Sequence, residues 1–187
     1  MTGGRPPRSP EERLSRRLSY VLRHKPSAAG VELDPQGWVD VAVLLEGLSR
    51  TGHGTSRAQL EAVVARSPKQ RFALDPTGQR IRAQQGHTVD VDLGLRPVEP
   101  PATLYHGTLA ASVDGILREG LTPRGRHHVH LSADPETARA VGARRGRPVV
   151  LVVDARGMSR AGHLFFVSGN GVWLTDEVPP RYLQAPP

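Results

Sequence analysis

The chain contains no cysteine, and lysine occurs only at Lys25 and Lys69 among 187 residues. The absence of cysteine excludes a disulfide framework, a thiolate metal site and a cysteine nucleophile. The longest apolar runs, such as Val149–Val153, are far too short to span a bilayer. The N-terminal segment MTGGRPPRSP lacks the apolar core of a secretory signal peptide, so we expect a cytoplasmic protein.

Because lysine is scarce, arginine carries nearly all of the positive charge. The chain has 25 Lys and Arg against 18 Asp and Glu, which gives a formal net charge of +7. A guanidinium group is planar, always charged and able to bind two phosphate oxygens at once. The composition therefore favours a phosphate-bearing partner, most obviously nucleic acid. A GC-rich genome also replaces lysine with arginine, and composition alone does not choose between these explanations.

Hydrophobic periodicity predicts three helices in the first half of the chain. An apolar stripe repeats with helical spacing over residues 11–24, and Asp40 and Ser56 are suited to cap a second and a third helix. A β-hairpin is expected at residues 71–83, because Asp75-Pro76-Thr77-Gly78 separates two extended runs. Three helices followed by a hairpin is the element order of a winged-helix module.

The second half of the chain has a different pattern. Residues 95–102 contain three prolines and are typical of a linker. Beyond them we expect strands at 103–106, 128–132 and 149–154, helices at 110–118 and 135–145, and a hairpin at 164–175. The predicted class is therefore α+β. It comprises a disordered basic tail (residues 1–10), a first lobe (11–95) and a second lobe (96–187).

Several polar side chains are candidates for a site in the first lobe. Arg23-His24-Lys25 end the first helix, where cations either compensate the helix dipole or form an anion site. Arg80 and Arg82 share one face of a predicted strand by the two-residue period. Exposed arginine on a hairpin is more often merely solvated, so the residues alone leave both interpretations open.

The second lobe offers histidines and a glycine near predicted strand ends. Gly107 would let a ligand approach the backbone, and Thr108 would cap a helix or donate to a phosphate. His128 and His130 face the same side of a strand, but no cysteine or paired carboxylate completes a tetrahedral site, so we expect no metal. Basic clusters in both lobes, without an obvious carboxylate base, suit phosphoryl chemistry driven by electrostatic stabilisation.

Eight short sequences occur in a fixed order along the chain. They are LSYVLRHKP (18–26), GWVDVAVLL (37–45), RFAL (71–74), IRAQQGH (81–87), LYHGT (104–108), HVHLS (128–132), VGARRGRPVVL (141–151) and FFVSGNGVWLT (165–175). With them the chain resembles the KptA-type RNA 2′-phosphotransferases, over nearly everything from residue 14 to residue 183.

The resemblance implies a winged-helix RNA-binding lobe followed by an ADP-ribosyltransferase-like lobe that binds NAD⁺ as co-substrate. It also implies a reaction of two steps. An internal RNA 2′-phosphate attacks the nicotinamide ribose of NAD⁺ and releases nicotinamide. The ribose 2″-hydroxyl then attacks the phosphate, which yields 2′-OH RNA and ADP-ribose 1″,2″-cyclic phosphate. No metal is needed, and we expect a monomer.

The resemblance also implies which residues act. The catalytic group would be Arg23, His24, Arg82 and Arg144, with Arg145 replacing Arg144 if the register shifts by one. Three guanidiniums can hold a phosphate dianion, and a histidine can donate a proton to the phosphate or to the leaving RNA oxygen. The NAD⁺ contacts would be His106, Gly107, Thr108, His130, Ser132, Ser168, Asn170 and Val172. At the position of Val172 a glutamate would mark a protein-modifying transferase. Hairpin geometry alone explains Asn170 equally well.

Two alternatives remain at this stage. One is an ADP-ribosyltransferase that modifies terminal phosphates of nucleic acid, or another acceptor, without the second step. The other is a winged-helix nucleic-acid-binding protein whose second lobe only binds a nucleotide, although the retained histidines and arginines argue against it. The physiological RNA would be tRNA where tRNA splicing leaves a 2′-phosphate.

Overall fold

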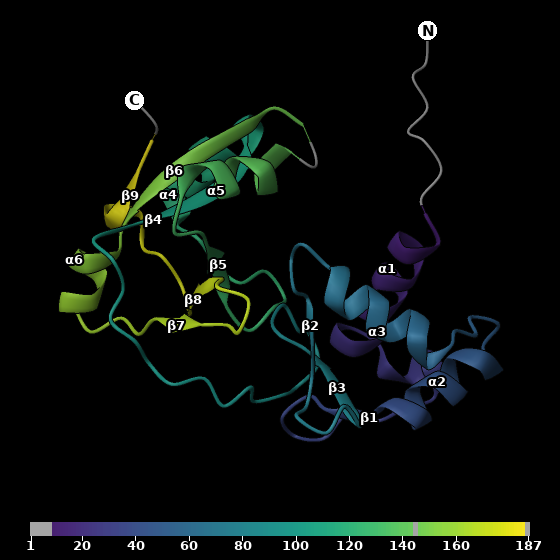
Figure 1. The fold of residues 1–187 in the computed structure, drawn as a ribbon. Coiled ribbons are helices and arrows are strands. Elements are labelled where there is room, and N and C mark those ends of the chain that lie inside the picture. Colours follow the sequence, from purple (N-terminus) through teal and green to yellow (C-terminus); the bar gives the residue numbers. More distant parts are fainter. Residues whose placement is uncertain (1–8, 144–145, 186–187) are drawn as a thin grey trace, which may run out of the picture. The chain divides into compact units, whose positions relative to one another are not determined.

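The computed structural model describes residues 9–143 and 146–185 (Figure 1). Helices and small antiparallel sheets alternate along the chain, in agreement with the predicted α+β class. Contacts within the chain divide it into two compact units, the first ending at Gly94 and the second beginning at Leu95. Each unit has an apolar core of its own.

The described part of the first unit combines three helices with a three-stranded antiparallel sheet. Its elements are α1 (Pro10–Arg23), the 3-10 turn η1 (Pro26–Ala29), β1 (Val39–Asp40), α2 (Val41–Arg50), α3 (Arg57–Arg66), β2 (Phe72–Leu74) and β3 (Arg80–Ala83). Strand β3 lies between β1 and β2. The three helices and the hairpin were predicted. Strand β1 was missed because two residues are too few to show an alternating pattern.

Helix starts follow the capping residues. The Asp40 carboxylate accepts from the backbone N–H groups at the start of α2, at 2.7 and 3.1 Å. Ser56 and Gln59 form a reciprocal capping box at α3. The predicted tail over residues 1–10 is wrong at its end, because Ser9 caps α1 and Pro10 is its first helical residue. Residues 1–8 of that tail lie outside the described residues.

The core of the first unit fixes the C-terminal end of α1 against the hairpin. Leu18, Val21 and Leu22 are fully buried, and they share one cluster with Leu60 of α3 and Ile81 of β3. Burial of each such side chain stabilises the fold by about 1.5–3 kcal/mol. The last turn of α1 therefore has a defined position relative to the strands that follow it in the sequence.

The described part of the second unit contains two three-stranded antiparallel sheets with order β4-β6-β9 and β5-β8-β7. Its elements are β4 (Thr103–Leu109), η2 (Ala110–Ser112), α4 (Val113–Glu119), β5 (Val129–Leu131), α5 (Pro135–Gly142), β6 (Pro148–Asp154), α6 (Ala155–Arg160), β7 (Phe166–Val167), β8 (Trp173–Thr175), η4 (Pro180–Tyr182) and β9 (Leu183–Gln184). A backbone bridge between Tyr105 and Ser132 links the two sheets.

Several boundaries in the second unit differ from the prediction. Strand β4 continues to Leu109, because each of its residues pairs with β6. The single helix expected at 110–118 is a 3-10 turn followed by α4, and the helix expected to reach residue 145 ends at Gly142. Helix α6 was not predicted; it begins directly after β6, where Asp154 accepts from Gly157 N at 2.8 Å. Among the described residues, no helix combines the length and apolar content needed to cross a membrane.

Candidate functional site

Arg23 and His24 lie where α1 ends, and a loop from the hairpin closes over them. Arg23 is the last helical residue, and its carbonyl accepts from Thr88 N at 2.8 Å and Val89 N at 3.3 Å. The loop turns at Gly86, whose φ of +84° favours glycine. These contacts satisfy a helix carbonyl that would otherwise lack an intrahelical partner. They bring the LRH and IRAQQGH sequences together.

Thr88 also defines the hydrogen bonding of the His24 ring. The Thr88 hydroxyl donates to the carbonyl of Arg23 at 3.3 Å and lies 3.1 Å from Nδ1 of His24. When the hydroxyl donates to this carbonyl, its oxygen is able to accept from the Nδ1–H tautomer of the imidazole. In this tautomer the lone pair of the ring lies on Nε2.

Arg71 is the further residue that the structure places beside Arg23. Its carbonyl accepts from Nη2 of Arg23 at 3.4 Å, and its own Nη1 donates to Ser15 Oγ of α1 at 3.5 Å. It precedes β2 and is half-buried. RFAL is one of the eight sequences that carry the family resemblance, but no role was predicted for its arginine. Its place in that motif was the one sequence feature that could have identified Arg71.

Arg82 has different neighbours. Its guanidinium carbon lies 4.5 Å from the centre of the Trp38 ring, and Nη1 donates to the carbonyl of Gln36 at 3.3 Å. Burial lowers the pKa of Arg82, and the charge of Asp34 opposes this effect. Arg80 also lies over Trp38, at 5.4 Å, so the prediction that both arginines share one face of β3 is confirmed.

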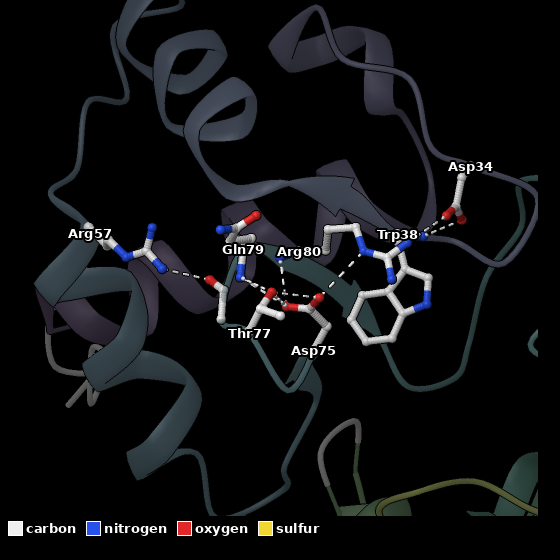
Figure 2. Close-up of polar contacts among 8 residues, drawn as sticks. Asp34, Trp38, Arg57, Asp75, Thr77, Gln79 and Arg80 are labelled. Atoms are coloured by element: carbon white, nitrogen blue, oxygen red, sulfur yellow. Dashed lines mark hydrogen bonds and ion pairs between the residues drawn. The ribbon is translucent and has the colours of Figure 1, made fainter.

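Hydrogen bonds of the hairpin turn hold Arg80 in place, as Figure 2 shows. Asp75 accepts from the backbone of Gln79 and Arg80 at 2.9 and 3.0 Å, and from the Thr77 hydroxyl. These hydrogen bonds lower the pKa of Asp75, with the bond from the Arg80 backbone as the largest cause. Arg57 of α3 donates to Gly78 O and ties the turn to the helix. The backbone of Arg80 is therefore fixed by the turn that precedes β3.

In the second unit, the structure brings three of the expected residues together. Nδ1 of His106 on β4 lies 3.1 Å from the carbonyl of His130 on β5. Ser132 exchanges two backbone hydrogen bonds with Tyr105, at 2.8 and 2.9 Å. Burial lowers the pKa of His106. The neutral ring therefore donates through Nδ1–H and keeps an accepting lone pair at Nε2.

Gly107 and Thr108 have structural roles other than those predicted. A Cβ at Gly107 would lie 1.7 Å from the carbonyl of Ala138, so α5 packs directly on β4 at this glycine. Thr108 is inside β4, opposite Val149, and the next helical turn is preceded by Leu109. The expectation that Thr108 caps a helix is therefore wrong. Contact of either residue with NAD⁺ stays a prediction.

Ser168, Asn170 and Val172 form a closed turn between β7 and β8. The buried Ser168 hydroxyl lies 2.7 Å from Asn170 Oδ1 and accepts from Val172 N at 3.1 Å. Gly171, with φ of +76°, completes the turn by donating to Ser168 O. These contacts agree with the hairpin interpretation of Asn170, and a ligand role for the three residues stays a prediction.

Comparison with known proteins decides the family. The model of the RNA 2′-phosphotransferase, Tpt1/KptA family matches residues 9–177. A probable RNA 2′-phosphotransferase of Streptomyces griseus is 57% identical over 178 residues, 91% of this chain and 94% of that protein. Proteins of the same description from Nostoc punctiforme and Agrobacterium fabrum are 54% and 57% identical; they cover 92% and 90% of this chain, and 95% and 91% of their own lengths. The chain belongs to the RNA 2′-phosphotransferase family. The resemblance noted from the sequence is thus confirmed.

One expected catalytic residue of this RNA 2′-phosphotransferase family member has no described position. Arg144, and its neighbour Arg145, lie outside the described residues. The preceding helix α5 ends at Gly142, with Ala143 at its C-cap. The choice between Arg144 and Arg145 therefore stays a prediction from the motif.

The family member shows no described cluster suited to a metal ion. Within residues 9–143 and 146–185, no three histidine, aspartate or glutamate side chains gather as ligands. His128 Nε2 and Asp176 Oδ1 lie 3.8 Å apart. His128 also packs on Phe166, with 5.5 Å between ring centres, and burial lowers its pKa. A packing role accounts for these contacts.

Proposed function

We propose that this chain removes an internal 2′-phosphate from RNA by transferring it to NAD⁺. In this proposal the first unit is a winged-helix RNA-binding lobe, and the second is an ADP-ribosyltransferase-like lobe that binds NAD⁺. Family membership over residues 9–177 supports the reaction. The observation that carries it in the structure is the fixed pairing of Arg23 and His24 by Thr88 at the end of α1.

The arginines supply the charge that phosphate chemistry needs. A phosphate dianion is held best by several guanidiniums whose donors are already oriented. Arg23 and Arg144 fill this role in the proposal, together with one arginine of the hairpin. The resemblance pointed to Arg82 for that last position. The contacts favour Arg71, because its backbone bonds to Arg23 whereas the Arg82 guanidinium is stacked on Trp38.

His24 moves the proton in this proposal. With Nδ1–H donating to Thr88, the ring presents Nε2 for proton exchange. In the protonated state Nε2 donates to the phosphate or to the RNA 2′-oxygen as that oxygen leaves. Arg23, adjacent in the sequence, stabilises the negative charge that this step develops on the phosphate.

The donor set of the second unit fits a ribose-bearing co-substrate. NAD⁺ supplies the electrophilic ribose carbon and the leaving nicotinamide. The neutral His106 ring accepts a hydrogen bond from a ribose hydroxyl through Nε2, because its Nδ1–H donates to the carbonyl of His130. Ser132 is held beside it by its backbone bonds to Tyr105. Neutral acceptors and hydroxyl groups form hydrogen bonds with sugar hydroxyls, whereas cationic groups would also attract phosphate.

One experiment tests the reaction. The protein is incubated with an oligoribonucleotide carrying an internal 2′-phosphate, with and without NAD⁺, beside a 5′-phosphorylated control. We expect loss of the 2′-phosphate only with NAD⁺, together with release of nicotinamide. A stable ADP-ribosylated product on the 5′-phosphorylated control alone would identify the terminal-phosphate transferase instead. RNA binding without change of either substrate would leave only a binding protein.

A further inference from the structure

A groove runs between α1 and α3 in the first unit, and none of the proposed catalytic residues lines it. Its volume is about 530 Å³. Its apolar lining comes from Leu14 on α1 and from Ala58, Ala62 and Val63 on α3. Because alanines line one wall, the helices leave room there for an incoming ligand.

The rim of this groove is cationic. Arg13 and Arg17 of α1, Arg66 of α3 and His53 of the preceding loop line it, against the single carboxylate of Glu11. Arg66 pairs with Glu11 at 2.9 Å, but their side chains are 72% and 54% exposed. So exposed a pair contributes little to stability and can exchange its partner for an incoming anion. The net charge of the groove therefore selects an anionic occupant.

A stripe on α1 continues the groove toward His24. Arg13, Arg17 and Tyr20 follow one another at intervals of four and three residues, so they share one helix face over about 10 Å. His24, the C-cap of the helix, follows Tyr20 four residues later. Arg17 is held by a 2.8 Å hydrogen bond to Ala28 O, and its guanidinium lies 5.9 Å from the Tyr20 ring centre. Tyr20 is 42% exposed. The stripe therefore ends about one helical turn before the proposed catalytic histidine.

We propose that this groove and stripe bind the single-stranded RNA that adjoins the nucleotide carrying the 2′-phosphate, an inference that rests on the proposed function. RNA supplies a phosphate at each residue for the arginines and a flat base for Tyr20 and the Arg17 plane. The Asp and Glu side chains of an acidic peptide would satisfy the arginines but offer no ring to Tyr20, whereas each nucleotide carries both a phosphate and a flat base. The combination of charge and an exposed ring therefore favours RNA.

The test compares substitutions inside the groove with matched ones outside it. Arg13→Glu and Ala58→Glu place a carboxylate in the groove, and the second adds an acid in the first turn of α3, where the helix dipole tolerates it. Arg16→Glu and Ala65→Glu make the same changes of charge on exposed positions of the same helices that do not line the groove. Circular dichroism melting curves check that all four variants fold.

Affinity is measured by fluorescence anisotropy, without NAD⁺, for a 2′-phosphorylated trinucleotide and for a chain of about ten nucleotides. We expect the groove variants to lower the ratio of long-chain to trinucleotide affinity about tenfold, and the controls to change it less than twofold. Loss of one cation also reduces the slope of log affinity against log salt by about 0.7. Equal losses in groove and control variants would overturn the proposal, since net charge alone would then explain binding.

Competition distinguishes the occupant. Unlabelled RNA should displace the labelled chain, whereas poly-glutamate of equal charge should displace it at least tenfold less well. Equal displacement would overturn the assignment to RNA. The outcome is separable from the phosphotransfer reaction. If groove variants weaken RNA binding while the wild type removes no 2′-phosphate, the proposed function fails and the groove remains. If they bind as the wild type does while 2′-phosphate is removed, the groove proposal alone fails.

Discussion

The backbone carbonyl of Arg71 accepts a hydrogen bond from the guanidinium of Arg23, with 3.4 Å between the two atoms. The same carbonyl accepts from Gln84 N at 3.0 Å, so the first residue of the hairpin is tied both to its second arm and to α1. This relationship places the Arg71 backbone beside the end of α1, while the Arg71 side chain donates to Ser15 Oγ of the same helix. It gives the hairpin a second candidate arginine besides Arg82.

Substitution of these two arginines should have different consequences. We expect Arg71→Gln to lower kcat about hundredfold with little change in stability, as for loss of one oriented donor to a developing charge. Arg82→Gln should lower stability by about 1 kcal/mol, because it removes the cation–π contact with Trp38. Steady-state turnover and urea denaturation measure the two effects.

The reverse pattern would contradict this assignment. If Arg82→Gln abolishes turnover in a protein of wild-type stability, and Arg71→Gln does not, then Arg82 is the catalytic arginine that the resemblance implied. Arg80→Gln is the matched control, since Arg80 lies over the same Trp38 ring at 5.4 Å. It should share the stability loss of Arg82→Gln in part and leave kcat near that of the wild type.

Thr88 offers a test of the His24 assignment. Thr88→Val removes the oxygen that accepts from Nδ1–H, so the ring loses its fixed orientation, and we expect kcat to fall about tenfold with KM nearly unchanged. Thr88→Ser retains the hydroxyl and should restore most of the activity. A serine variant as impaired as the valine variant would show that the methyl group matters, rather than the hydrogen bond to His24.

Local chemistry explains what the sequence predicted well. The caps at Asp40 and Ser56 and the turn at Asp75–Gly78 depend on side chains within a few residues, and all three are present in the structure. The position of Arg71 beside Arg23 could not be predicted this way. Its contact with Arg23 joins residues that are distant in sequence and are brought together only by packing of the hairpin on α1.

In the second unit, too, a contact between residues distant in sequence could not be predicted, here at a glycine. The LYHGT sequence led us to expect that a ligand approaches the backbone at Gly107. The close neighbour is the carbonyl of Ala138 on α5, which no local pattern reveals. The strand was likewise expected to end at His106, because its continuation to Leu109 depends on pairing with β6. Family motifs therefore identified positions, while tertiary contacts determine their physical roles.

The contact at Gly107 predicts a large effect of a single methyl group. Gly107→Ala should destabilise the protein by about 3 kcal/mol, since a Cβ would overlap the carbonyl of Ala138 and force α5 off the strand. Gly115→Ala in α4 is the matched control, because a Cβ at Gly115 would meet no atom within 4 Å beyond the backbone of its own helix. It should stabilise by up to about 1 kcal/mol. Chemical denaturation of both variants measures the difference, and similar effects would refute the packing role.

The family motif predicts which of two adjacent arginines acts. Arg144→Ala should lower kcat about hundredfold, and Arg145→Ala by less than about fivefold. An arginine accelerates the reaction mainly when its N–H donors point at the negative charge that develops on the phosphate. The two variants have the same net charge, so each is the control for the other. A larger loss in Arg145→Ala would show that the motif register is shifted by one residue.

Stability should depend on pH through His106. Burial lowers its pKa in the folded state, so the unfolded chain binds a proton first as the pH falls below the ordinary histidine value of about 6.5. The free energy of unfolding should therefore fall from that pH down to the lowered pKa of the folded protein, and level off below it. The comparison is with His106→Gln, whose unfolding free energy should fall less over the same range. His128→Gln is the second control, since burial lowers the pKa of His128 as well. Urea denaturation at about pH 8 and about pH 5 measures the change in unfolding free energy between the two pH values. An equal change in His106→Gln and the wild type would mean that the folded protein protonates His106 as readily as the unfolded chain does.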